Sequence, residues 1–99
     1  MKAAVLAAPG EIRIEEAEIP LPGDGEVRIR VEGCGVCASN LDPWAGLPWI
    51  EYPGEPGGLG HESWGIVDAI GPDVGTVKVG DRVAAPGRRG VRRADRPVR

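Results

Sequence analysis

The sequence predicts one mainly β domain, a barrel or a sandwich, with almost no helix. Its 99 residues suffice for a single domain with a small core. Short apolar stretches, several of them with a two-residue alternation, recur along the first 85 residues. Turn residues, chiefly Gly, Pro and Asp, separate these stretches at close spacing. That pattern favours an all-β domain over alternating strands and helices.

Two strands are expected near the N-terminus. The apolar run KAAVLAA ends at Pro9-Gly10, and its continuous apolar character suits a strand covered on both faces. The next stretch, EIRIE, places Ile12 and Ile14 on one face. The alternation then changes phase, so we expect a bulge or a strand end near Glu16.

The stretch EVRIRVE has the clearest alternation in the chain. It predicts a strand with Val27, Ile29 and Val31 facing a core. Arg28 and Arg30, at the intervening positions, are expected to be exposed.

The second half of the chain adds a further apolar strand, WGIVDAI. After it, TVKVGDRVAA predicts two short strands about a Gly-Asp turn. Residues 37–60 leave room for at most one short helix, because Pro43 stops it after about one turn. Gly65 and Gly71 are expected where a strand bends or where another backbone approaches closely.

The charge of the chain changes sign near residue 86. Residues 1–85 carry six Lys and Arg against fourteen Asp and Glu, whereas residues 86–99 carry six Arg against Asp95 alone. We therefore divide the chain into a domain, residues 1–86, and a basic tail, residues 87–99. Since like charges repel, we expect the tail to be disordered. Its Arg, Gly and Pro content favours a truncated or frame-shifted product over a nucleic-acid-binding arm.

The two cysteines, Cys34 and Cys37, are spaced as C-x-x-C. The chain has no apolar run that approaches a membrane span and no signal peptide, so a cytoplasmic protein is expected. Disulfides are rare there, which leaves a metal ligand, a redox pair and inert thiols as alternatives. The segment GCGVCA also matches a dinucleotide-binding turn. Pro43 leaves no room for the long helix of such a site, so no cofactor-binding residue is assigned.

The single histidine, His61, lies within a longer pattern, G-H-E-x2-G-x5-G-x2-V. The segment GVCASNL, whose Cys37 lies 24 residues before His61, precedes it, and VGDRV follows it. Together the three segments resemble the N-terminal catalytic domain of the zinc-dependent alcohol dehydrogenases, in the medium-chain dehydrogenase/reductase family. The resemblance covers residues 1–86. It implies a GroES-like fold, a partly open antiparallel β-barrel.

The resemblance implies roles for four residues. Cys37 and His61 match two ligands of the catalytic zinc, and a thiolate and an imidazole suit that ion. Ser39 matches a hydroxyl that carries the substrate proton away, and Glu62 an acid beside the metal. Taken alone, Ser39 would suit a helix N-cap and Glu62 a solvated carboxylate. The family's third ligand has no counterpart in the chain, so we expect weak or partial zinc binding completed by water or Glu62.

Five positions depart from the family pattern or have no set role in it. Asn40 stands where many members carry an Asp that supports the zinc-binding histidine. Asp42 stands where some carry a relay histidine, and Cys34 is a non-ligand by analogy. Trp44 and Trp49 fall in a segment that often lines the substrate pocket, although they suit a core cover equally well.

The resemblance also implies the chemistry of a full-length parent. That enzyme would transfer a hydride between a small alcohol and an aldehyde or ketone, with NAD(P) bound by a Rossmann domain in the parent only. We expect the parent to be a homo-oligomer and the present chain to be inactive alone. The alternative is a non-enzymatic small β-barrel that binds a protein partner or nucleic acid through its basic tail. We expect no membrane partner and no specific nucleic-acid target.

Overall fold

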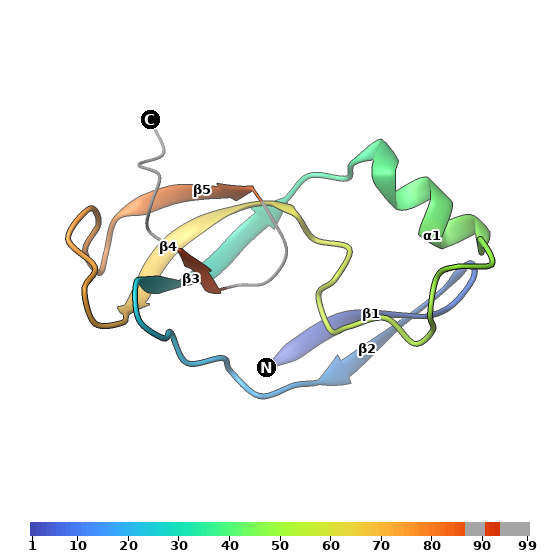
Figure 1. Ribbon diagram of the computed structural model, residues 1–99, viewed down its shortest axis with the longest axis horizontal. Coiled ribbons are helices and arrows are strands. Elements are labelled where there is room, and N and C mark those ends of the chain that lie inside the picture. The colour runs from blue at the N-terminus through green and yellow to red at the C-terminus, as the bar shows by residue number, and fades with distance from the viewer. Residues whose placement is uncertain (87–90, 94–99) are drawn as a thin grey trace.

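The structure, a computed structural model, describes residues 1–86 and 91–93. It consists of two antiparallel sheets, one of two strands and one of four strands in the order β5-β4-β3-β6 (Figure 1). The strands are β1 (Lys2–Ala8), β2 (Glu11–Glu16), β3 (Glu26–Cys34), β4 (Glu62–Ile70), β5 (Arg82–Pro86) and β6 (Val91–Arg93). The helical residues are the 3-10 turn η1 (Ala38–Asn40) and the helix α1 (Leu41–Ala45) that follows it directly.

The predicted fold class, mainly β with one short helix, is confirmed for the described residues, and two antiparallel sheets fit a partly open barrel. In Figure 1 the β1–β2 ribbon and α1 lie at one end of the molecule, and β3, β4 and β5 lie at the other. Across residues 1–86 and 91–93, no helix is long and apolar enough to cross a membrane.

The β1–β2 ribbon forms where the sequence predicts it. The two strands pair from Lys2 opposite Glu16 to Ala8 opposite Glu11. The neighbouring residues Val5 and Leu6 are both buried, so β1 is covered on both faces as predicted. The predicted strand end near Glu16 is also confirmed.

A small core lies on one face of the four-stranded sheet. Val27 and Ile29 of β3 pack there with Val67 of β4 and Ala85 of β5. The predicted inward orientation of Val27 and Ile29 is therefore confirmed. The partly buried residues around this core are Val74, Val77 and Val83.

The prediction for the rest of β3 is partly wrong. Val31 is 49% exposed, because its cross-strand neighbour is Gly65, which has no side chain to cover it. Arg30 is exposed as predicted. Arg28 is half-buried instead, because its Nε donates to Asp68 Oδ1 at 2.8 Å and the two groups form an ion pair.

Only the second of the two strands predicted in TVKVGDRVAA forms. The first part is a turn, in which the backbone N–H of Lys78 donates to the Asp81 carboxylate at 2.9 Å. Gly80 N–H donates to Val67 O at 2.8 Å, and Val67 N–H donates to Asp81 O at 2.9 Å. These bonds occupy the backbone N–H and carbonyl groups of Val67. Residues 76–79 therefore form no ladder with β4.

The helix is short, but Pro43 does not end it. Pro43 lies in the first turn of α1, where a missing N–H costs nothing. The helix ends instead at Gly46, whose φ of 88° is the left-handed conformation typical of a C-cap. Its N–H donates to Asp42 O at 3.1 Å.

Gly65 and Gly71 lie where backbones approach closely, as predicted. A Cβ on Gly65 would overlap the carbonyl oxygen of Arg30 on the neighbouring strand. A Cβ on Gly71 would overlap the carbonyl oxygen of Gly23.

The predicted disordered tail, residues 87–99, lies mostly outside the described residues. Of this segment only β6 is described, and it pairs antiparallel with β3 from Glu26 opposite Arg93 to Arg28 opposite Val91. For residues 87–90 and 94–99 the expectation stays a prediction.

Candidate metal centre

The antiparallel pairing of β3 with β4 brings the two motif segments together. Cys34, the last residue of β3, lies opposite Ser63 near the start of β4. The pairing extends one step further, since Gly35 N–H donates to Glu62 O at 2.9 Å. Cys37 follows β3 and His61 directly precedes β4, so both residues lie at the same end of the sheet.

The loop before β4 is fixed against the other sheet. Gly54 N–H donates to Leu6 O at 2.9 Å, and Gly57 N–H donates to Ala4 O at 2.8 Å. Gly60 N–H closes a turn onto Gly57 O at 3.0 Å. These backbone bonds hold the residues that lead into His61 beside β1.

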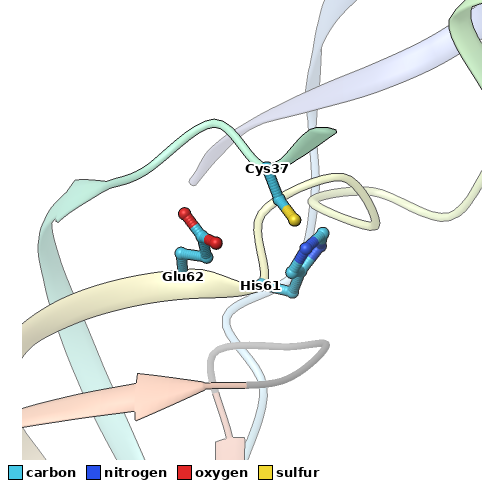
Figure 2. A group of neighbouring side chains, drawn as sticks. All are labelled: Cys37, His61 and Glu62. Carbon is cyan, nitrogen blue, oxygen red and sulfur yellow. The ribbon is translucent and has the colours of Figure 1, made fainter. Parts of the chain in front are cut away.

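Three potential ligand atoms converge at this end of the sheet (Figure 2). The Cys37 sulfur, a ring nitrogen of His61 and a carboxylate oxygen of Glu62 all lie within 4.8 Å of one another. Cys37 points toward the His61 ring, and Glu62 extends from the start of β4. Cys37 and His61 are half-buried and Glu62 is exposed. Within residues 1–86 and 91–93, this is the one such group of three or more His, Cys, Asp or Glu residues.

Gly35 makes room for the Glu62 carboxylate. A Cβ at this position would overlap Oε2 of Glu62. The backbone bond from Gly35 N–H to Glu62 O fixes the same pair of residues. A glycine at the end of β3 therefore allows the carboxylate to lie against the chain that leads to Cys37.

Ser39 lies against the same cluster, within η1. Its Oγ is 3.1 Å from Nε2 of His61, and the two atoms share a hydrogen bond. The N-cap of η1 is Cys37 and that of α1 is Asn40. Ser39 therefore does not serve as the helix N-cap that its residue type alone would suggest.

The cluster favours the thiolate form of Cys37. Hydrogen bonds from the Ser39 side chain, then from the His61 ring, then from the Ser39 backbone lower the pKa of the Cys37 thiol. Burial and the negative charge of Glu62 act in the opposite direction but do not reverse the shift. A thiolate is the form in which cysteine binds a metal ion.

Ser39→Ala should raise the pKa of Cys37 toward its ordinary value. The substitution removes the largest contribution to the lowered pKa. The rise of thiolate absorbance with pH, measured in metal-free Cys34→Ser protein with and without the Ser39 change, reports Cys37 alone. The midpoint should move to higher pH in the double variant, and an unchanged midpoint would contradict the assigned hydrogen bond.

Of the two remaining residues, Asn40 contributes differently from expectation, whereas Cys34 lies outside the ligand cluster, as the family analogy implies. The Asn40 Nδ2 donates to Leu59 O at 3.2 Å, so this amide fixes the loop before His61, not the imidazole ring. Cys34 is exposed, donates weakly to Gly35 O at 3.3 Å and does not belong to the ligand cluster.

An apolar cleft of about 440 Å³ adjoins Cys37. Trp44 lines it, whereas Trp49 is 76% exposed and does not line it. The sequence indicated Trp44 as a possible lining residue. Val36 and Leu41 lie in the GVCASNL segment but were given no such role, and Ala4, Ile12 and Leu59 come from separate segments. The lining residues are Ala4, Ile12, Cys34, Gly35, Val36, Cys37, Asn40, Leu41, Trp44, Leu59 and Gly60.

Known proteins share both the sequence and the fold. An uncharacterized zinc-type alcohol dehydrogenase-like protein of Escherichia coli strain K12 is 44% identical over 82 residues, which are 81% of this chain and 24% of that protein. An alcohol dehydrogenase of a Moraxella species is 44% identical over 84 residues, 84% of this chain and 25% of that enzyme.

Among solved structures, a short chain alcohol dehydrogenase from Escherichia coli CFT073 in complex with NADH superposes with a TM-score of 0.70 at 38% identity. The match covers 85% of this chain and 23% of that one. The chain thus spans about a quarter of the length of these relatives. Residues 23–95 match the family of the alcohol dehydrogenase GroES-like domain, and the chain belongs to that family.

Proposed function

We propose that this chain is the zinc-binding part of the catalytic domain of an NAD(P)-linked alcohol dehydrogenase. The reaction of the whole enzyme would be hydride transfer between an alcohol and an aldehyde or ketone. The observation that carries the proposal is the convergence of a sulfur, an imidazole nitrogen and a carboxylate oxygen within 4.8 Å. The zinc-type relative and the relative in complex with NADH support the choice of metal and cofactor.

Cys37, His61 and Glu62 are the residues that would hold the zinc. Sulfur, nitrogen and oxygen donors of this kind are the usual protein ligands of zinc, and a set of three leaves one position open for substrate. Bound zinc supplies a Lewis acid that polarises an alcohol or carbonyl oxygen. The lowered pKa of Cys37 fits this role, because it favours the thiolate, the form that binds a metal ion.

Ser39 is the residue that would move the substrate proton. Its hydroxyl can both accept and donate a hydrogen bond, which a proton relay requires. Its contact with the His61 ring at 3.1 Å supports a position next to the reacting oxygen. NAD(P) would bind to the part of the protein that this chain does not span, so the chain alone should not turn over substrate.

The cellular setting belongs to the same proposal. Both cysteines are free thiols, which fits a cytoplasmic protein. The parent would act on small alcohols or carbonyl compounds as a homo-oligomer.

Metal content tests this proposal directly. The metal-free chain, dialysed against zinc and then against metal-free buffer, should retain up to one zinc per chain. Cobalt, added in place of zinc, should give the absorption band of a cobalt–thiolate bond, since Cys37 is a ligand. Absence of both bound zinc and the thiolate band would overturn the proposal.

A further inference from the structure

We propose that Cys34 and Cys37 form a reversible disulfide when a peroxide oxidises them, and that this bond releases the metal ion. They are the two cysteines of the chain, and both are free thiols. Cys37 belongs to the ligand cluster, whereas Cys34 does not. The bond would therefore join a metal ligand to a spare thiol. Disulfide formation is independent of the proposed function, but the release of zinc rests on it.

The two sulfur atoms lie beside neighbouring residues of one turn. The Cys34 sulfur lies against Gly60, since a Cβ added to Gly60 would be 3.5 Å from it. The Cys37 sulfur lies within 4.8 Å of a ring nitrogen of His61, the next residue. Both cysteines also line the apolar cleft. A small oxidant that enters the cleft therefore meets both residues.

The connection between the cysteines can change its conformation at little cost. Gly35 and Val36 are the two residues between them, and neither belongs to a helix or strand. Val36 is 89% exposed, so a new backbone conformation there disturbs little packing. Glycine tolerates most backbone conformations. A disulfide requires the two Cα atoms to come within about 7 Å, which a tighter connection provides.

Closing the bond should withdraw Cys37 from the ligand cluster. Cys34 is the last residue of the paired strand β3. The next residue, Gly35, is held by its backbone bond to Glu62 O, so Cys37 is the end that moves. Its sulfur would also lose the thiolate form in which cysteine binds a metal ion. Only His61 and Glu62 would remain of the cluster.

Hydrogen peroxide is the simplest oxidant for this bond. Its O–O bond breaks as one oxygen is transferred to the exposed Cys34 thiol, which gives a sulfenic acid and one water. The Cys37 sulfur then attacks the Cys34 sulfur. The S–S bond forms, the S–O bond breaks, and the OH group leaves as a second water with a proton from Cys37, or from solvent where zinc has replaced that proton. Two thiols are thus oxidised and one peroxide is reduced.

Intact mass spectrometry tests the bond itself. The reduced, zinc-free chain is treated with hydrogen peroxide at low protein concentration. The monomer should lose the mass of two hydrogen atoms together with both free thiols, and dithiothreitol should restore both. Because the chain has two cysteines, such a loss within a monomer assigns the bond to Cys34 and Cys37.

A chromophoric chelator follows the consequence for the metal. Peroxide should release zinc from the loaded chain, and dithiothreitol should allow zinc to bind again. The zinc affinity of the oxidised chain should be at least about 100-fold lower than that of the reduced chain, as expected for loss of a ligand.

Cys34→Ala and Cys34→Ser separate the disulfide from direct oxidation of the ligand. Both variants keep Cys37 but remove its partner, and Cys34 is exposed, so the fold should not depend on it. Peroxide should release zinc from them several-fold more slowly. Dithiothreitol should restore less of the binding, because an unpartnered Cys37 can pass on to the irreversible sulfinic acid.

Several results would overturn the inference. They are a monomer that keeps both thiols or reaches only sulfinic acid, a disulfide formed only between chains, and an oxidised monomer with unchanged zinc affinity. Equal and equally reversible zinc release from the parent chain and the Cys34 variants would overturn it as well. A reduced chain that binds no zinc would count against the proposed function, and the mass and thiol content of the oxidised monomer would still decide on the disulfide.

Discussion

Cys37→Ala should reduce the zinc affinity of this domain at least about 100-fold, and His61→Ala should have an equally large effect. Loss of a group that merely orients a zinc ligand typically costs about 10- to 100-fold in affinity, so loss of a ligand itself should cost no less. Only two protein ligand atoms would remain of the three that lie within 4.8 Å of one another. Competition with a chromophoric chelator at fixed pH gives the affinities of the parent chain and both variants.

Cys34→Ala is the matched control for these substitutions. Cys34 is of the same residue type and lies three residues from Cys37, but it is not part of the ligand cluster. Its replacement should change the zinc affinity little. If Cys34→Ala and Cys37→Ala weakened zinc binding equally, the metal would be bound by the C-x-x-C pair, and the assignment of His61 and Glu62 would be wrong.

Strands could be predicted wherever apolar and polar residues alternate in the sequence with a two-residue period. Val27 and Ile29 fall on the buried face of β3 because their pleat positions meet Val67 and Ala85. Val31 continues the same alternation, yet it is exposed. The burial of Val31 depends on the residue opposite it on the neighbouring strand. The sequence alone does not show that this residue is Gly65.

The turn before β5 shows a second limit. The alternation in TVKV suggests a strand, but Gly80 N–H donates to Val67 O and Val67 N–H donates to Asp81 O, and these bonds take up the backbone groups that a ladder would need. The competing turn is stabilised by the Asp81 carboxylate, which accepts from Lys78 N–H at 2.9 Å. Local turn chemistry therefore outweighed the strand pattern.

The candidate site was predicted because its motif segments resemble those of the zinc-dependent alcohol dehydrogenases, and both segments adjoin recognisable strands. Antiparallel pairing of EVRIRVE with WGIVDAI is sufficient to bring the residues after the first strand close to those before the second. The cleft beside it was not accessible in this way. Its wall combines residues of β1, β2, α1 and the loop before β4, and only the three-dimensional packing of these segments brings them together.

Gly65→Ala should destabilise the domain by about 3 kcal/mol or more, the upper end of the cost of inserting atoms into well-packed structure. The new Cβ would overlap the carbonyl oxygen of Arg30, which belongs to the backbone of β3 and cannot rotate away. The two central strands would have to separate. Because Gly65 lies between the core and the start of β4, zinc affinity should fall as well. Urea unfolding, followed by tryptophan fluorescence, measures the loss of stability as a lower midpoint.

Gly75→Ala provides the control for the added methyl group. A Cβ on Gly75 meets no atom within 4 Å, and the residue lies in the loop between β4 and β5. The same substitution should therefore leave the stability unchanged, or raise it by up to about 1 kcal/mol through reduced freedom of the unfolded chain. Equal midpoints for the two variants would mean that β3 and β4 do not approach as closely at Gly65 as the structure has them. If only Gly65→Ala lowers the midpoint, the stability of the domain depends on the close pairing of β3 with β4, the two strands that bring Cys37 near His61.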